Sequence, residues 1–208
     1  TAAAAHPNAH HREAIDAVAH HSSRLIADPL RLLDCAPVSD GGGALVVTAT
    51  PGARRVPVRG TGFATGHMHL SAAASLTAFS AGRALDMALR QAGAQRRDVD
   101  LALVYDCFTI AMLVNLEDLG LAEPGQAGKG FLDGRFGPAG ELPVNTHGGL
   151  LSHGHPARAG GMGNVVEAVV QLRGEAGARQ AGTRRLALAH GMGGVFATHG
   201  VLLLGAPR

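Results

Sequence analysis

Apolar and small residues recur along this chain at two spacings, which predict a succession of strands and helices. Spacings of three and four residues mark a helix over 78–92, and Gly93 directly after it is of a residue type that commonly ends helices. A near-continuous apolar run over 99–105 predicts a strand that is buried on both faces. The remaining predicted strands cover residues 44–50, 56–63, 186–190 and 195–204.

Two further helices complete the predicted pattern. One begins near Thr109, where Asp106 is placed to cap it. The other carries an apolar stripe over 162–170, with Glu167 and Gln171 on the opposite side. The order strand–helix–strand–helix–helix–strand–strand predicts an α/β layered fold, in which a mixed β-sheet is flanked by helices.

Composition supports a folded core and excludes several classes of function. Of the 208 residues, 46% are hydrophobic and 16% are charged, and Trp is absent, so we expect a globular protein with an aliphatic core. A formal net charge of +2, without basic residues interleaved with aromatic ones, argues against nucleic-acid binding. No apolar run approaches the roughly 18 residues that cross a membrane. Cys35 and Cys107 provide no disulfide framework, so we expect a cytoplasmic protein.

Five histidines gather near the N-terminus, namely His6, His10, His11, His20 and His21. The first two have the i, i+4 spacing of a helix face, which is one arrangement of metal ligands. Neither a cysteine cluster nor a His-Glu-x-x-His pattern accompanies them. We interpret these histidines as exposed polar residues and expect no metal site.

The segment 142–162 combines several features that catalysis uses. His147, His153 and His155 lie among glycines, which let the backbone approach a ligand closely. The helix that follows begins with free N–H groups, and a histidine at such a place can transfer protons near neutral pH. The alternative interpretation is a polar surface turn.

Two other loops carry candidate residues at the ends of predicted strands. Tyr105 to Phe108 follow one strand, and His190 ends another, with glycines after it whose amides suit an oxyanion hole. Open α/β sheets bind ligands beyond the carboxyl ends of their strands, so we expect Cys107, His155 and His190 to face one cavity. The helix start after Cys107 is expected to lower the pKa of its thiol. The alternatives are an inert buried cysteine and histidines that are satisfied within their loops.

These segments resemble motifs of the thiolase superfamily, in the branch of thiolases related to sterol carrier protein that includes lipid-transfer proteins. Residues 148–162 (GGLLSHGHPARAGGM) resemble the Gly-His-Pro loop, and residues 105–108 (YDCF) resemble the His-Asp-Cys-Phe loop. Residues 186–194 (LALAHGMGG) resemble the final glycine-rich loop of these proteins. Residues 26–47 resemble the segment that leads into the last strand of the N-terminal domain. The four motifs follow the order of the family.

The resemblance implies a thiolase-like fold of which this chain holds the later half. Residues 1–50 would be a remnant of the loop region and last strand of the N-terminal domain, and residues 51–208 would be the C-terminal domain. The family's Cys-x-Ser nucleophile loop is absent from the sequence. We therefore expect the fragment to be inactive alone. The exposed edges of the strand at 44–50 need cover, which favours a homo-oligomer or a partner protein.

The resemblance also assigns roles to single residues. His155 would activate the nucleophilic cysteine and stabilise a thioester oxyanion, and Cys107 would exchange the proton at the α-carbon. His190 would stand in the final loop, where other thiolases carry a cysteine. The remaining positions would shape the site that binds coenzyme A or acyl-CoA as substrate, with no covalently bound cofactor: Asn145, Gly149, Gly193 and Gly194.

Three functions remain open at this point. The favoured one is an acyltransferase of lipid metabolism that carries out reversible Claisen-type cleavage or condensation of a 3-oxoacyl-CoA. Tyr105 stands where the motif has histidine, and a related branch cleaves steroid side-chain CoA thioesters as retro-aldol lyases through tyrosine, which is the second possibility. The third is a non-catalytic subunit that binds acyl-CoA or lipid and scaffolds an OB-fold zinc-ribbon partner.

Overall fold

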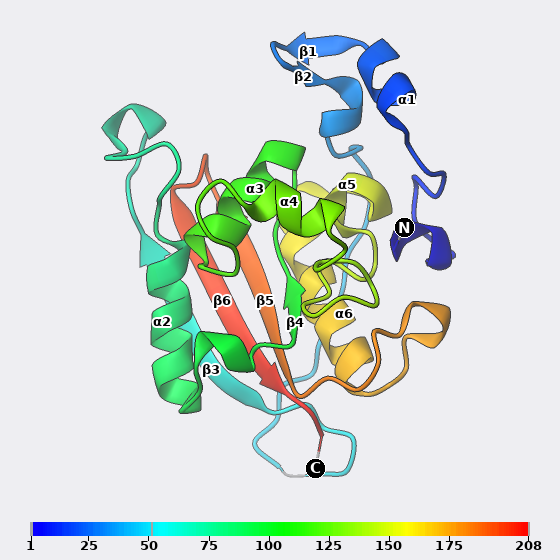
Figure 1. The fold of residues 1–208 in the computed structure, drawn as a ribbon. Helices are drawn as coiled ribbons and strands as arrows, with labels where there is room; N and C mark the ends of the chain where they lie inside the picture. The colour runs from blue at the N-terminus through cyan, green and yellow to red at the C-terminus, as the bar shows by residue number, and fades with distance from the viewer. Residues whose placement is uncertain (1, 51, 208) are drawn as a thin grey trace.

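The computed structural model describes residues 2–50 and 52–207, and a four-stranded mixed sheet forms its centre (Figure 1). In sequence order the strands are β3 (Val58–Thr65), β4 (Leu101–Leu103), β5 (Leu186–Gly193) and β6 (Thr198–Gly205). In space the order is β3-β6-β5-β4. The pair β4 and β5 is parallel, and the other two pairs are antiparallel. The predicted mixed sheet is confirmed.

Three longer helices flank this sheet, and shorter elements lie around it. The longer ones are α2 (Ala81–Ala92), α3 (Thr109–Asp118) and α6 (Gly160–Leu172). The shorter elements are α1 (Ala17–Ser22), α4 (Ala127–Leu132), α5 (Gly149–His153) and the hairpin strands β1 (Leu25–Ala27) and β2 (Leu30–Arg31). None of the helices in the described part of the chain has the length and apolar character that crossing a membrane requires.

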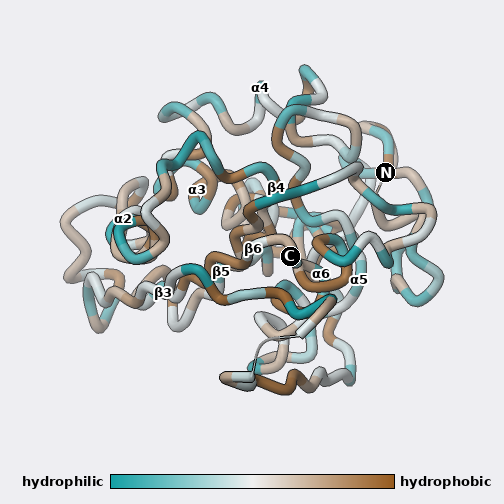
Figure 2. The backbone as a smooth tube through the Cα atoms, turned by 90° about the horizontal axis from the view of Figure 1, so that it is seen from below, coloured by the Kyte–Doolittle hydropathy of each residue, from teal (hydrophilic) through white to brown (hydrophobic). Residues whose placement is uncertain are grey.

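Alternation along β4 divides the core into two halves. Ala102 and Val104 pack with α2 and α3 on one face of the sheet. Leu101 and Leu103 pack with α6 on the other face. Because successive side chains of a strand point to opposite faces of the sheet, a continuous apolar run such as this one contributes residues to both halves of the core. Figure 2 shows hydrophobic positions gathered along β5, between the helices.

The backbones of α2 and β3 lie in direct contact. A side chain at Gly62 would place its Cβ 1.8 Å from the carbonyl oxygen of Ala84, so only glycine fits this strand position. The helix ends as its sequence predicts, because Gly93 takes the left-handed conformation with φ of 62°. Phe63 points to the opposite face of β3 and remains largely exposed.

The prediction of a strand at 44–50 is wrong for this structure. The segment has no strand partner within the described residues, and the side chain of Val46 is 95% exposed. Its apolar sequence still suits a strand. A strand needs a neighbour to pair its backbone groups, and none of the four sheet strands pairs with this segment.

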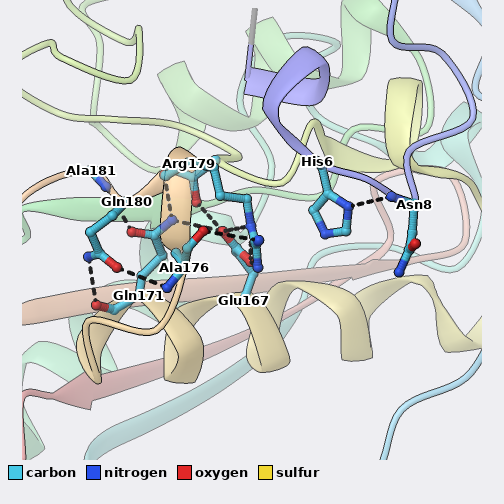
Figure 3. A network of polar contacts seen from close by, with 9 residues as sticks. His6, Asn8, Glu167, Gln171, Ala176, Arg179, Gln180 and Ala181 are labelled. Carbon is cyan, nitrogen blue, oxygen red and sulfur yellow. Dashed lines mark hydrogen bonds and ion pairs between the residues drawn. The ribbon is translucent and has the colours of Figure 1, made fainter.

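The polar side of α6, which carries Glu167 and Gln171, is buried. Glu167 is only 3% exposed, and Gln171 is buried beside it. Figure 3 shows why: Arg179, in the short 3-10 helix η6 (Gly177–Arg179), folds back over α6 and reaches both carboxylate oxygens of Glu167. Burial alone would raise the pKa of Glu167, and hydrogen bonds from Arg179, Gln171 and Thr146 bring it below its ordinary value. A paired, buried carboxylate therefore lies on the side of α6 opposite its apolar stripe.

Candidate active site

Of the four predicted catalytic residues, Tyr105 and His155 have side chains that are hydrogen-bonded to each other. Tyr105 follows the end of β4, and His155 lies in the connection between α5 and α6. The Tyr105 Oη atom is 3.0 Å from His155 Nε2, and the two rings meet edge to face. The backbone N–H of His155 donates to the Pro37 carbonyl, so the N-terminal segment also fixes the position of this histidine.

The environment of Tyr105 keeps its phenol protonated. Burial is the largest cause that raises the pKa of Tyr105, and repulsion from Cys107 and Asp106 in their ionised forms raises it further. A protonated phenol within hydrogen-bond distance of an imidazole can pass a proton in either direction. The pair thus has the geometry of an acid–base couple.

A cavity of about 280 Å³ opens beside Tyr105, at the edge of the sheet where the parallel strands β4 and β5 end. Tyr105 contributes a phenol hydroxyl group to the wall of this cavity, and Arg158 contributes a cationic side chain. The other residues in its wall are mostly small or apolar: Phe63, Ala157, Gly161, Gly191, Met192, Gly193, Thr198 and Gly200. A wall rich in glycine leaves room for a substrate close to the backbone.

Asp106 caps a helix, but not the predicted one. Its carboxylate accepts the backbone N–H of Leu150 at 2.7 Å, in the first turn of α5. The helix α3 begins after Phe108 without a side-chain cap. Phe108, directly before α3, is extended and pairs with Cys35, and α5 presents its free N–H groups to the buried carboxylate instead. Burial raises the pKa of Asp106 to about 7, against the opposing effect of these hydrogen bonds.

The expectation of a lowered thiol pKa at Cys107 is wrong. Burial raises the pKa of Cys107 to about 11, and the negative charge of Asp106 contributes to the rise. Backbone N–H groups at the start of α3 act in the expected direction, but their effect is smaller. Cys107 is half-buried. None of Cys107, His155 and His190 is part of the cavity wall described above, so the prediction that these three side chains face one cavity is wrong for this cavity.

His190 lies inside the sheet, not at its rim. It is only 1% exposed, and β5 continues beyond it to Gly193, paired with β6 along its whole length. Its Nε2 is 3.0 Å from His199 Nδ1, and its Nδ1 accepts the backbone N–H of Tyr105 at 3.4 Å. Burial lowers the pKa of His190 to about 3, so the ring is neutral. In this structure His190 holds the backbone of Tyr105 and does not reach the cavity.

The four residues expected to bind the substrate have different surroundings. Asn145 uses its side-chain amide to hold both the N–H and the carbonyl of Val104, at 2.7 and 2.9 Å. Gly149 lies beneath Asp106 with φ of 67°. Gly193 lines the cavity, whereas Gly194 forms the turn between β5 and β6 with φ of 64°.

Three buried polar residues around Tyr105 were missed by sequence reasoning. Asn115 donates to the carbonyl of Tyr105 at 2.8 Å, and Asn164 donates to the carbonyl of His190 at 3.0 Å. His199 joins His190 to the turn at Phe196. Asn115 and Asn164 each sit inside helical patterns, where a lone polar residue on the apolar face is a signal that the sequence did contain.

The N-terminal histidines differ in their surroundings. His10, His11 and His21 are exposed, whereas His6 is half-buried because its ring packs against His153 at 4.5 Å between centroids. His20 is also half-buried, with its Nε2 at 2.9 Å from a carboxylate oxygen of Asp34. Across residues 2–50 and 52–207, no group of three or more histidine, cysteine or acidic side chains is arranged to hold a metal ion.

Comparison with known proteins places this geometry in a family. Residues 62–206 match the model of the thiolase C-terminal domain-like family. The acetyl-CoA acetyltransferase of Methanothermobacter thermautotrophicus is 39% identical over 186 residues, which cover 86% of this chain and 49% of that protein. Sterol carrier protein 2 of Bos taurus is 31% identical over 183 residues, which cover 83% of this chain and 34% of that protein.

A solved structure, the "Ltp2-ChsH2(DUF35) aldolase", matches this fold with a TM-score of 0.84 and 28% sequence identity. The match covers 100% of this chain and 56% of that chain. The chain spans about half the length of its acetyltransferase relative, or 49%. The resemblance seen in the sequence motifs is therefore confirmed, and the chain belongs to the thiolase superfamily, with its thiolase C-terminal domain-like part at residues 62–206.

Proposed function

We propose that the complete protein cleaves a carbon–carbon bond in an acyl-CoA thioester, with Tyr105 and His155 as its acid–base pair. The hydrogen bond of 3.0 Å between these side chains, with Tyr105 in the cavity wall, carries the proposal. The acetyltransferase and aldolase relatives support carbon–carbon chemistry in general. Between the two reactions, the Tyr105–His155 pair favours retro-aldol cleavage.

The substrate of this reaction is a 3-hydroxyacyl-CoA. The oxygen of Tyr105 accepts the proton of the 3-hydroxyl group while the phenol proton passes to Nε2 of His155. The electrons of the O–H bond form the carbonyl of the released aldehyde or ketone, and the C2–C3 bonding pair moves into the thioester enolate. The proton on His155 then returns through Tyr105 to C2. Protons and electrons balance without a further reactant.

Thiolysis of a 3-oxoacyl-CoA, which the sequence favours, is the second candidate. The acetyltransferase relative supports it. In that reaction Cys107 would exchange the proton at the α-carbon. A thiol with a pKa of about 11 is poorly suited to this task near neutral pH. We therefore place retro-aldol cleavage first.

The two reactions can be separated with the complete enzyme and two substrates. A 3-hydroxyacyl-CoA without free coenzyme A tests retro-aldol cleavage, and a 3-oxoacyl-CoA with coenzyme A tests thiolysis. We expect turnover of the first substrate, and we expect Cys107→Ala to retain it within about threefold, because the thiol transfers no proton in this scheme. Turnover of the second substrate alone, abolished by Cys107→Ala, would establish thiolysis instead. Binding of acyl-CoA without turnover of either substrate would support the non-catalytic scaffold.

We also propose that the exposed apolar segment at 44–50 is covered in the complete assembly. Val46 and Val47 are almost fully exposed, and an unpaired apolar segment of this kind is prone to association. A homo-oligomer satisfies this need. The aldolase relative is named for two components, Ltp2 and ChsH2(DUF35), which supports a partner protein. That this partner is of the OB-fold zinc-ribbon kind is our proposal from the family resemblance. A cytoplasmic location likewise remains our proposal.

A further inference from the structure

Two connections join the loop after β4 to the segment that carries His155. The first is the hydrogen bond between Tyr105 and His155. The second involves the next residue of the loop, because the carboxylate of Asp106 accepts the N–H of Leu150 at 2.7 Å and contacts that of Leu151 at 3.5 Å. The helix α5 ends at His153, two residues before His155. Two consecutive residues of the loop, Tyr105 and Asp106, are thus hydrogen-bonded to the segment 150–155 at two separate points.

The surroundings of Asp106 are shaped to fit its carboxylate. A Cβ at Gly149 would lie 1.9 Å from Asp106 Oδ2, so a side chain at this position would displace the carboxylate. Asn145 supplies a further hydrogen bond to it, and Asn145 is itself held by both backbone groups of Val104. Glycine, asparagine and aspartate therefore form one buried unit between β4 and α5.

The helix α5 depends on this unit for its place. Five residues are too few for a helix that is stable by itself, because nucleation of the first turn is unfavourable. A buried carboxylate that accepts N–H groups of the first turn offsets part of this cost. Removing a carboxylate from water costs free energy. The hydrogen bonds from α5 to Asp106 offset this cost.

We propose that Asp106 is a positioning residue whose carboxylate sets the start of α5 and thereby the distance between the His155 imidazole and the Tyr105 phenol. It touches neither the substrate nor the transferred proton. Loss of the carboxylate would let α5 shift, and a shift of about 1 Å between reacting groups can reduce a rate by about 10²-fold. The activity part of the test rests on the proposed function, and the spectroscopic part does not.

A double-mutant cycle in the complete enzyme tests the proposal. Asp106→Asn keeps the size of the side chain but leaves one oxygen acceptor in place of two. We expect kcat to fall by about 10²-fold with KM within about threefold. In the His155→Ala background the same substitution should have almost no further effect, because the distance that it perturbs no longer matters. Equal effects in both backgrounds would contradict the proposal.

Asp118→Asn is the matched control. The carboxylate of Asp118 also accepts two backbone N–H groups, those of Phe79 and Ala81, at the start of α2 and away from the cavity. We expect it to lower the melting temperature like Asp106→Asn and to keep kcat. If Asp106→Asn does not fold, Gly149→Ala replaces it in the cycle, because its Cβ displaces the carboxylate without removing it.

Tyr105 gives a readout that needs no turnover, because subtraction of the spectrum of a Tyr105→Phe variant isolates its signal from that of any other tyrosine. The ultraviolet difference spectrum between the enzyme and its Tyr105→Phe variant reports whether the phenol is hydrogen-bonded. We expect Asp106→Asn to shift this spectrum to that of His155→Ala, and Asp118→Asn to leave it unchanged. An unchanged spectrum in Asp106→Asn would overturn the positioning role. A shifted spectrum in an enzyme that cleaves neither substrate would instead reject the proposed function alone.

Discussion

Two histidines flank Tyr105, and the structure gives them opposite environments. His155 meets the phenol of Tyr105 next to the cavity, on a connection between two helices. His190 meets the backbone N–H of the same residue from inside the sheet, where it is stacked on His199 and shut off from solvent. Both lie in glycine-rich motifs, and the motif alone does not distinguish them.

The surroundings of His155 and His190 differ in whether the imidazole can be reached by solvent and substrate. A histidine that transfers protons must reach the substrate and must change charge near neutral pH. His190 does neither, since burial lowers its pKa to about 3 and its side chain is only 1% exposed. Its place in a chain of hydrogen bonds from Tyr105 to Phe196 gives it a structural task instead. Variants of the two histidines should therefore separate activity from stability.

His155→Ala should have the largest effect of the series, and it should fall on activity. Removal of the acid–base partner of Tyr105 is expected to lower kcat by about 10²–10⁴-fold, the usual contribution of such a group. Because His155 is only half-buried, the free energy of unfolding should change by less than about 1 kcal/mol. Initial rates and urea denaturation of the complete enzyme measure both quantities. A kcat within tenfold of the wild type would contradict the role of His155.

His190→Leu should show the reverse pattern. The substitution leaves the Tyr105 N–H and His199 Nδ1 without their buried partner, which is expected to cost about 2–3 kcal/mol of unfolding free energy. We expect the remaining folded enzyme to lose less activity than His155→Ala. Urea denaturation followed by rate measurements under folded conditions tests this. A stable variant without activity would show that His190 takes part in the chemistry.

The pH dependence of stability should report on two buried histidines, His147 and His190. Burial lowers the pKa of His190 to about 3 and that of His147 to about 4, below their unfolded value of 6.5. Their contribution to stability is therefore fully present above pH 6.5 and is lost as pH falls toward these folded values. Each is expected to remove about 1.4 kcal/mol per pH unit within that window. Urea titrations between pH 7 and pH 4 measure the slope, and His190→Leu should reduce it.

Much of the fold could be predicted from the sequence because its signals are local. The apolar run at 99–105 marks β4, and Gly93 marks the end of α2. The segment at 44–50 has an equally clear strand signal, yet it stays unpaired. The pattern of a segment indicates the conformation that it favours. Whether it becomes a strand also depends on another segment that can pair with it.

The candidate site was predictable to the level of motifs and not of contacts. The Tyr105 and His155 loops were located from their motifs and from the rule on strand ends. The burial of His190 was not predicted from the sequence. Gly191 suggested that the strand ends at His190, whereas antiparallel pairing continues to Gly193. The partner of Asp106 lies 44 residues away at Leu150, whereas the nearby helix start was the obvious choice. Such outcomes depend on tertiary packing, which local periodicity does not encode.

The most direct test of the central claim is the rate at which Tyr105→Phe in the complete enzyme cleaves a 3-hydroxyacyl-CoA. The substitution keeps the ring in the cavity wall and removes only the hydroxyl that meets His155. If the pair transfers the proton, kcat should fall by at least about 10²-fold while the unfolding free energy changes little. A rate close to that of the wild-type enzyme would contradict the account.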